Sequence, residues 1–167
     1  PEQKTPEAIA KSTRIGANYI AVEDVMYFSQ QELGIVADIR YVDIAARWAI
    51  DPDEIRITDG VKAFSKYGTR DLNSGLLLRK ALNNERPRVY RTDDEGNRYL
   101  DVTATAQAEL KMRDIIDVFQ TWMIADPERA ERITKTFNER YNSVKRRTHS
   151  TERLDVTGVA PNVLDML

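Results

Sequence analysis

The sequence contains no cysteine and only one histidine among its 167 residues. Without cysteine the chain can form neither a disulfide framework nor a thiolate metal site, and such a composition is typical of proteins of the reducing cytoplasm. The one histidine, His149, lies near Arg146 and Arg147 in a polar segment. Because a catalytic histidine needs an orienting partner and a metal site needs further ligands, we expect His149 to be a surface residue.

Long hydrophobic runs and the short motifs of known enzymes are also missing. No segment approaches the roughly 18 apolar residues of a membrane span, and no apolar core of a signal peptide follows Lys4. We therefore expect a cytoplasmic protein without membrane contact. Gly68 and Gly75 belong to no phosphate-binding glycine-rich loop, and no Gly-x-Ser-x-Gly nucleophile elbow occurs. We expect this segment to hold no cofactor.

The acidic residues do not follow a metal-binding pattern. Asp93–Glu95 are adjacent carboxylates, whereas calcium loops place their ligands at alternate positions, so we expect a solvated hairpin tip. A free-standing enzyme is the least supported hypothesis, because no acid–base pair or nucleophile is visible. A deep pocket lined by Asp43, Asp53 and Glu54 would revive that hypothesis.

Charge is nearly balanced overall, with a net charge of −2, but it is uneven along the chain. The segments Arg79–Arg91 and Arg140–Arg153 each carry five basic residues and one acid, whereas Thr92–Glu128 carries nine acids and three bases. The most concentrated basic cluster comprises Arg140, Lys145, Arg146 and Arg147. These side chains are candidates for contacts to DNA phosphates. The alternative is a basic helix end whose cations offset the helix dipole.

Periodicity predicts the elements of the first half of the chain. Thr5-Pro6-Glu7 suits the start of a short helix, although residues 1–20 have the alternative of a flexible terminus. Residues Ala21–Leu33 have helical spacing, and Gly34 is well placed to end that helix. Tyr41–Ile50 alternates with period two and predicts one half-buried strand, followed by a turn at Asp51-Pro52-Asp53 and a partner strand at Ile55–Ile57.

The second half of the chain is predicted to be mainly helical. Thr69–Asn83 is predicted to be a helix, and two short strands flanking residues 92–97 are predicted to form a β-hairpin. Val102–Asn142 predicts two helices joined at Asp126-Pro127, with Ala108, Met112, Ile115, Phe119 and Trp122 on one face. The expected fold is α+β and mostly helical, with a long antiparallel helix hairpin and a small antiparallel sheet. We expect residues 1–167 to form a single accessory domain, in which residues 143–167 are an irregular basic tail leading toward a following domain.

From Lys66 onward, the chain contains a series of short sequence segments that occur in the same order in a known protein family. The pieces are Lys66-Tyr67-Gly68-Thr69-Arg70, Asn73, Leu82-Asn83, Val89-Tyr90, Thr103, Ala106, Lys111, Ile115, Phe119, Trp122, Asp126-Pro127-Glu128-Arg129, Phe137-Asn138 and Tyr141-Asn142. This region is similar to one in large phage and plasmid proteins that combine an adenine-specific DNA methyltransferase with an SNF2-like (strawberry-notch-like) helicase. The DarB-like phage anti-restriction proteins are related to them.

The resemblance implies a role but no catalytic residue. In that family the region precedes the helicase motor, and the catalytic motifs of the methyltransferase and the helicase lie outside this chain. An Asp-Gly-Ser-His run usual in the family is replaced here by Arg147-Thr148-His149-Ser150. We therefore expect a non-catalytic connector or DNA-engaging module whose partners are DNA and the flanking domains. The alternative hypothesis is a structural or protein-interaction domain that does not touch nucleic acid.

Overall fold

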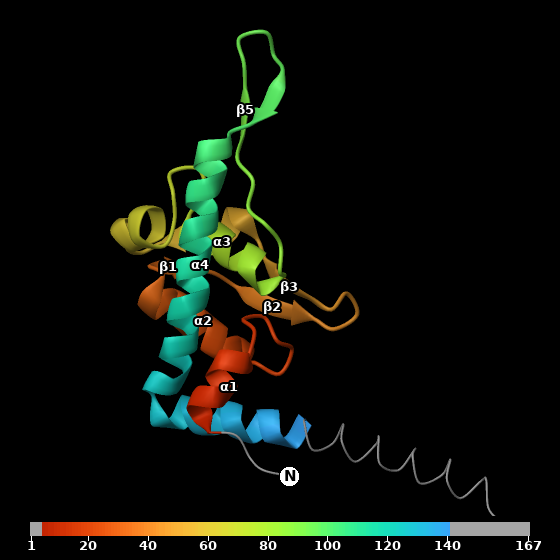
Figure 1. Cartoon of the computed structure of the whole chain (residues 1–167), viewed down its shortest axis with the longest axis vertical. Helices are drawn as coiled ribbons and strands as arrows, with labels where there is room; N and C mark the ends of the chain where they lie inside the picture. The colour runs from red at the N-terminus through yellow and green to blue at the C-terminus, as the bar shows by residue number, and fades with distance from the viewer. Residues whose placement is uncertain (1–4, 141–167) are drawn as a thin grey trace, which may run out of the picture.

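The computed structural model describes residues 5–140, which form helices and three small antiparallel sheets (Figure 1). In chain order the elements are α1 (Pro6–Ser12), α2 (Val22–Glu32), β1 (Ile35–Val36), β2 (Ile39–Val42), β3 (Arg47–Ile50), the 3-10 helix η1 (Pro52–Glu54), β4 (Arg56–Ile57), the π-helix η2 (Lys62–Lys66), α3 (Ser74–Leu82), β5 (Tyr90–Thr92), β6 (Arg98–Leu100) and α4 (Val102–Ala125). Residues 127–140 form a further helix. Each sheet has two strands, paired as β1–β4, β2–β3 and β5–β6. The α+β class and its helical character are confirmed.

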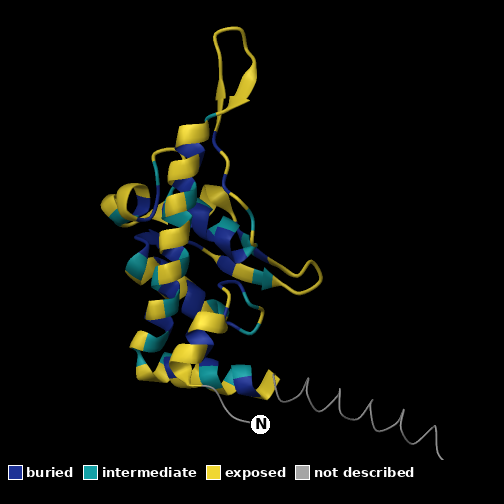
Figure 2. Ribbon diagram, in the orientation of Figure 1, coloured by how far each residue is buried: buried dark blue, intermediate teal, exposed yellow. Residues whose placement is uncertain are grey.

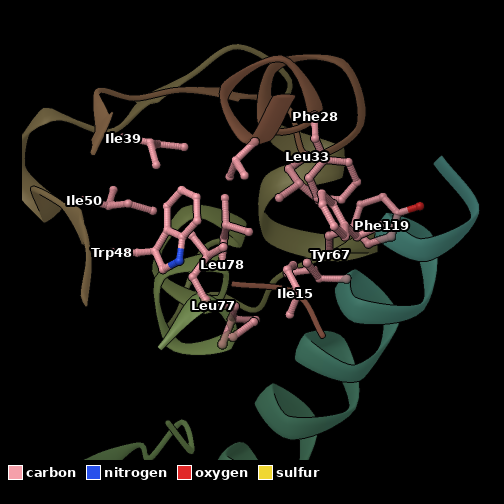
Figure 3. Close-up of a cluster of buried hydrophobic side chains, with 14 of the residues drawn as sticks. Ile15, Phe28, Leu33, Ile39, Trp48, Ile50, Tyr67, Leu77, Leu78 and Phe119 are labelled. Atoms are coloured by element: carbon pink, nitrogen blue, oxygen red, sulfur yellow. The ribbon is translucent and has the colours of Figure 1, made fainter. Parts of the chain in front are cut away.

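The long helix α4 runs along much of the length of the molecule (Figure 1), and its buried side chains belong to the core. Ala108, Ile115, Phe119 and Trp122 are buried, as the predicted stripe requires. Phe28 of α2 meets Phe119 edge to face, with ring centroids 5.0 Å apart. Figure 3 shows Phe28, Leu33, Trp48, Leu77, Leu78 and Phe119 in the hydrophobic cluster that joins α2, the β2–β3 hairpin, α3 and α4.

Of the two alternatives for the N-terminus, the capped helix is observed for the described residues. The Thr5 hydroxyl accepts a hydrogen bond from the Ala8 backbone N–H at 3.3 Å, and Pro6 occupies the first helical position. Ile9, Ile15 and Ile20 are all buried in the main core. Residues 5–20 are therefore an integral part of the domain.

The predicted continuous strand Tyr41–Ile50 is wrong, because the chain reverses within it. β2 and β3 form a hairpin whose register pairs Ile39 with Ile50 and Tyr41 with Trp48. Ala46 has φ of 51° in the connecting turn. Ile44, which a continuous strand would place on the same face as Trp48 and Ile50, is fully exposed. The reversal brings Ile39, Trp48 and Ile50 to one buried face, which a single straight strand could not do.

Two further expectations need correction in this part of the chain. Ile57 pairs with Ile35 in the β1–β4 sheet, so β4 is not the partner of the strand before it. Helix α3 begins at Ser74, capped by the Asn73 side chain, later than the predicted Thr69. The Thr69 hydroxyl instead accepts a hydrogen bond from the Leu72 backbone N–H at 3.0 Å. This local turn uses the polar groups that would otherwise have started a helix.

The joint at Asp126-Pro127 is confirmed as a helix start, but the two helices do not run antiparallel. The Asp126 carboxylate accepts a hydrogen bond from the Arg129 backbone N–H at 3.1 Å. The 127–140 helix then turns across the end of α4 instead of folding back along it (Figure 1). Its Phe137 packs edge to face on Tyr19, and its Arg132 pairs with Asp24. The 127–140 helix thus packs on the N-terminal part of the chain, a partner that helical periodicity alone cannot identify.

Gly16 and Gly96 provide a matched test of packing in this fold. Both have positive φ, but a Cβ at Gly16 would lie 2.1 Å from the Leu82 carbonyl oxygen, whereas a Cβ at Gly96 meets nothing within 4 Å. We expect Gly96→Ala to cost about 1 kcal/mol of unfolding free energy from backbone strain. Gly16→Ala should cost the same strain and lose about 1–3 kcal/mol more of unfolding free energy, because its Cβ would overpack the chain at Leu82. Urea unfolding of both variants measures the difference, and equal losses would contradict the close approach at Gly16.

Candidate functional site

The predicted phosphate-contact residues are only partly within the described structure. Arg140 is exposed near the end of the 127–140 helix, where its Nη1 donates a hydrogen bond to the Asn18 side-chain oxygen at 3.2 Å. Lys145, Arg146 and Arg147 lie outside the described residues, as does His149. Arg140 therefore marks the place on the domain surface from which the basic segment continues in sequence.

At the opposite end of the molecule the β5–β6 hairpin projects as an arm, defined here as residues 90–100 (Figure 1). Every residue of the arm is exposed, as the colouring of Figure 2 shows. The predicted hairpin and its acidic tip are thus confirmed. Isolated two-stranded hairpins are marginally stable in water, so contacts at the base of the arm must hold it in place.

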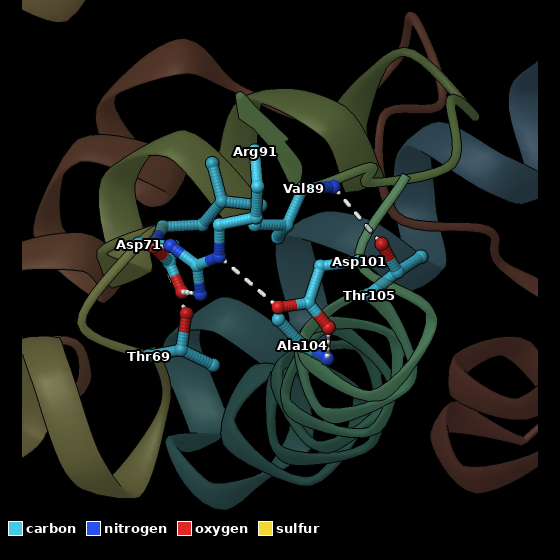
Figure 4. A network of polar contacts seen from close by, with 8 residues as sticks. Thr69, Asp71, Val89, Arg91, Asp101, Ala104 and Thr105 are labelled. Atoms are coloured by element: carbon cyan, nitrogen blue, oxygen red, sulfur yellow. Dashed lines mark hydrogen bonds and ion pairs between the residues drawn. The ribbon is translucent and has the colours of Figure 1, made fainter. Parts of the chain in front are cut away.

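An arginine clasp, formed by Asp71, Arg91 and Asp101, fixes the base of the arm (Figure 4). The Arg91 guanidinium binds the Asp71 carboxylate through two nitrogens, at 2.8 and 3.1 Å. Its Nε donates to Asp101 at 3.0 Å. The clasp therefore ties β5 both to the loop before α3 and to the N-terminus of α4.

Hydrogen bonding sets the protonation of the clasp. The Ala104 backbone N–H and then the Arg91 guanidinium favour the carboxylate form, so the pKa of Asp101 lies below its usual value. Hydrogen bonds to Asp71 and Asp101 raise the pKa of Arg91. Asp101 and Arg91 are consequently charged near neutral pH.

A second set of contacts holds the other side of the arm. The Val89 backbone N–H donates to the Thr105 hydroxyl at 2.9 Å, and the Asp101 backbone N–H donates to the Val89 carbonyl at 2.8 Å. Val89 is buried under these bonds. Val89 and Thr105 thus attach the arm directly to the first turn of α4.

A polar hollow of about 500 Å³ lies beside the clasp, lined in part by Thr69, Arg70, Thr103 and Gln107. Nε, Nη1 and Nη2 of Arg91 all engage carboxylates. The Arg91 guanidinium is therefore already bound to two carboxylates of the protein. We assign the clasp a structural role, because its side chains bind one another and Asp101 also caps α4.

Asp43, Asp53 and Glu54, which would revive a free-standing enzyme, do not line the hollow beside the clasp. Asp43 is exposed in the turn between β2 and β3, and Asp53 and Glu54 are exposed in η1. Within residues 5–140, no group of three or more His, Cys, Asp or Glu side chains is placed to hold a metal ion. None of the helices described is long and apolar enough to cross a membrane.

Two arginine-lined hollows flank β3 and were not predicted. The Asn18 hollow, of about 420 Å³, includes Arg14, Asn18, Tyr41 and Arg47 in its lining. The Arg79 hollow, of about 370 Å³, includes Arg40, Arg47, Asp51 and Arg79. The register of β2–β3 places Arg40 and Arg47 on its outer face, opposite the buried Trp48. Had the hairpin turn at residues 43–46 been recognised in the sequence, Arg40 and Arg47 could have been placed together on the outer face.

Substitution of Asp101 tests the charge of the clasp without removing the helix cap. Asn is also a good N-cap, so we expect Asp101→Asn to lower the melting temperature at pH 7 chiefly by removing the ion pair with Arg91. Because the folded-state pKa of Asp101 is depressed, its contribution is present above the unfolded-state pKa of about 3.9 and is lost as pH falls through the folded-state value. Thermal unfolding of both proteins should therefore show the difference shrinking below about pH 4.

Asp114→Asn on the exposed face of α4 is the control, since Asp114 makes no ion pair with any of residues 5–140. The melting temperature of Asp114→Asn should follow that of the unsubstituted protein at every pH. A difference for Asp101→Asn that persists undiminished at pH 3 would contradict the electrostatic account of the clasp.

Comparison with known proteins identifies the family of the chain. No curated protein and no solved structure matches it. A family model described as a domain of unknown function, DUF8437, matches residues 14–143, which include most of the core, the clasp and both arginine-lined hollows. Because this match covers most of the sequence, the chain belongs to the DUF8437 domain family.

Proposed function

We propose that this domain is a non-catalytic connector or DNA-engaging module of a DNA methyltransferase–helicase polypeptide of phage or mobile-element type. In this proposal it positions the helicase motor on DNA in the cytoplasm and performs no chemistry itself. The ordered resemblance from Lys66 to Asn142 supports the choice of parent. Several residues of that set are structural, including Phe119 and Trp122 in the core and the helix caps Asn73 and Asp126.

The position of Arg140 is the observation that carries the DNA-contact part of the proposal. Its guanidinium is exposed, and it is linked to the domain body through Asn18. The segment Arg140–Arg153, with five basic residues against one acid, continues from this point in sequence. Basic side chains that neutralise phosphates release condensed counterions, which makes binding strongly dependent on salt.

Salt-dependent binding of duplex DNA tests this contact. We expect the chain to bind a duplex, with log affinity falling linearly with log salt concentration. Replacing Arg140, Lys145, Arg146 and Arg147 with Ala should reduce the magnitude of that slope by about four, since each phosphate contact contributes about one. Fluorescence anisotropy between 50 and 200 mM salt measures both slopes.

A charge-matched variant provides the control. Replacing Arg56, Arg70, Arg88 and Arg113 with Ala removes the same charge from exposed positions that make no ion pair within residues 5–140. This variant should keep most of the slope of the unsubstituted chain. Absence of salt-dependent binding, or equal slopes for the two quadruple variants, would refute the DNA contact.

A second candidate function is a protein-interaction domain that acts through the arm. Exposed apolar side chains concentrate there and on the adjoining first turns of α4, where Tyr90, Leu100, Val102 and Leu110 are 40–72% exposed. Val102 and Leu110 are eight residues apart and therefore lie near the same side of the helix. Such a surface is typical of contact with a neighbouring domain.

Site-specific cross-linking separates this candidate from the first. A photo-crosslinking amino acid placed at Leu100 of the full gene product should attach to a neighbouring domain if the arm docks there. The same amino acid at Ile44, which is fully exposed at the tip of the β2–β3 hairpin, is the control. Peptide mapping that finds equal cross-linking from the two positions would argue against docking through the arm.

A further inference from the structure

We propose that Arg14, Arg40, Arg47 and Arg79 form an arginine track that holds the phosphodiester backbone of duplex DNA. The track would extend the nucleic-acid surface from Arg140 across the domain body, on residues that the basic tail does not include. This inference rests on the DNA engagement proposed above and adds a second, independent set of contacts to it.

The track is continuous because its members line two hollows that share β3. Arg14 and Arg47 line the Asn18 hollow, and Arg40, Arg47 and Arg79 line the Arg79 hollow. Arg47 belongs to both linings and so joins them. In the β2–β3 register, Arg40 is opposite Ala49 and Arg47 is opposite Val42, so both arginines project from the outer face.

Arg140 connects this surface to the basic segment. It donates to the side-chain oxygen of Asn18, which itself lines the first hollow. Tyr19, beside Asn18, packs on Phe137 of the same 127–140 helix. The last described turn of that helix therefore lies against the edge of the track.

The charge of the track is incompletely neutralised within the protein. Arg14 and Arg79 have no carboxylate of residues 5–140 within 4.0 Å, whereas Arg47 pairs with Glu85 at 3.1 Å. The pair of Arg40 with Asp38 is long, at 3.8 Å, and both side chains are about two-thirds exposed. Exposed pairs of this kind contribute about 0–1 kcal/mol, so a phosphate can replace such a partner at little cost.

The backbone beneath the track is held rigidly. The Trp48 indole N–H donates to the Gly16 carbonyl at 2.8 Å, which links β3 to the loop after Arg14. The Asn83 side chain accepts from the Trp48 backbone N–H at 2.9 Å and donates to the Trp48 carbonyl at 3.0 Å, which links β3 to the end of α3. The three segments that carry Arg14, Arg47 and Arg79 are thus fixed relative to one another before any ligand binds.

The residue type suits the binding of oxyanions. Guanidinium groups present planar donor pairs that match the oxygens of phosphates and carboxylates. All four basic members of the track are arginines, and among residues 5–140 Asp51 is the only carboxylate-bearing residue that lines either hollow. A repeating anion whose charges continue from one hollow to the next satisfies this arrangement, and the nucleic-acid backbone is such an anion.

The triple variant Arg14→Gln, Arg40→Gln and Arg79→Gln tests the track in the full chain. It leaves Arg47 and its pair with Glu85 intact, and circular dichroism and thermal unfolding should match those of the unsubstituted protein. We expect the salt slope of duplex binding to fall by about three, with a similar loss of affinity for duplexes of different sequence. The corresponding triple lysine variant should retain the slope.

The matched control is the triple variant Arg70→Gln, Arg88→Gln and Arg113→Gln. None of these three arginines lines either hollow. If the chain binds DNA and the tail variant loses affinity but the track variant does not, the track is refuted and the proposed function stands. If the track variant loses about three units of slope and the control does not, the track is supported even where the tail variant binds normally. Absence of duplex binding by the unsubstituted chain refutes both, and binding of polyglutamate in its place would assign the surface to an acidic protein.

Discussion

The fold depends on the contact between the aromatic side chains of α2 and α4. Phe28 packs edge to face on both Phe119 and Trp122, with ring centroids 5.0 and 5.3 Å away. These residues are far apart in sequence, so the contact closes most of the chain into one core. None of the described sheets has more than two strands, and such sheets are not independently stable. The hairpins therefore take their stability from the helices against which they are anchored.

Arg129 extends this aromatic contact to the last described helix. Its guanidinium lies over the Trp122 ring, 3.6 Å from the centroid, and donates to the Trp122 carbonyl at 2.7 Å. The indole N–H of Trp122 in turn donates to Gln31 of α2 at 2.8 Å. The arginine Nε is buried and has no hydrogen-bond partner among residues 5–140. The cation–π contact and the hydrogen bond to Trp122 must offset this cost. One tryptophan thus connects α2, α4 and the helix that leads to Arg140.

The elements that local chemistry determines could be predicted from the sequence. Thr5-Pro6, Gly34, the loop at residues 92–97 and Asp126-Pro127 each act on their immediate neighbours, and each lies at the predicted boundary. The period of the α4 stripe likewise identified its buried face, because a helix face is defined by spacing alone.

The errors occurred where a tertiary partner decides the outcome. The alternation from Tyr41 to Ile50 is compatible with one strand or with a hairpin, and the burial of Ile39 and Trp48 on a common face selects the hairpin. The direction of the 127–140 helix depends on Tyr19 and Asp24, which no pattern within that helix reveals. For the candidate site, only Arg140 of the described residues was predicted. The arginines beside β3 are scattered in sequence and meet only after folding.

Gly75 shows how closely the elements approach one another in this core. A Cβ at this position would lie 2.9 Å from the terminal methyl groups of both Ile35 and Ile55. A glycine that weakens α3 as an isolated helix, by about 1 kcal/mol relative to alanine, therefore lets α3 sit directly on the chain around β1 and β4. Only the side chains of Ile35 and Ile55 separate the backbone of α3 at Gly75 from this part of the chain. A larger residue at this position would force the terminal methyl groups of Ile35 and Ile55 to move, so we expect the three positions to vary together among relatives.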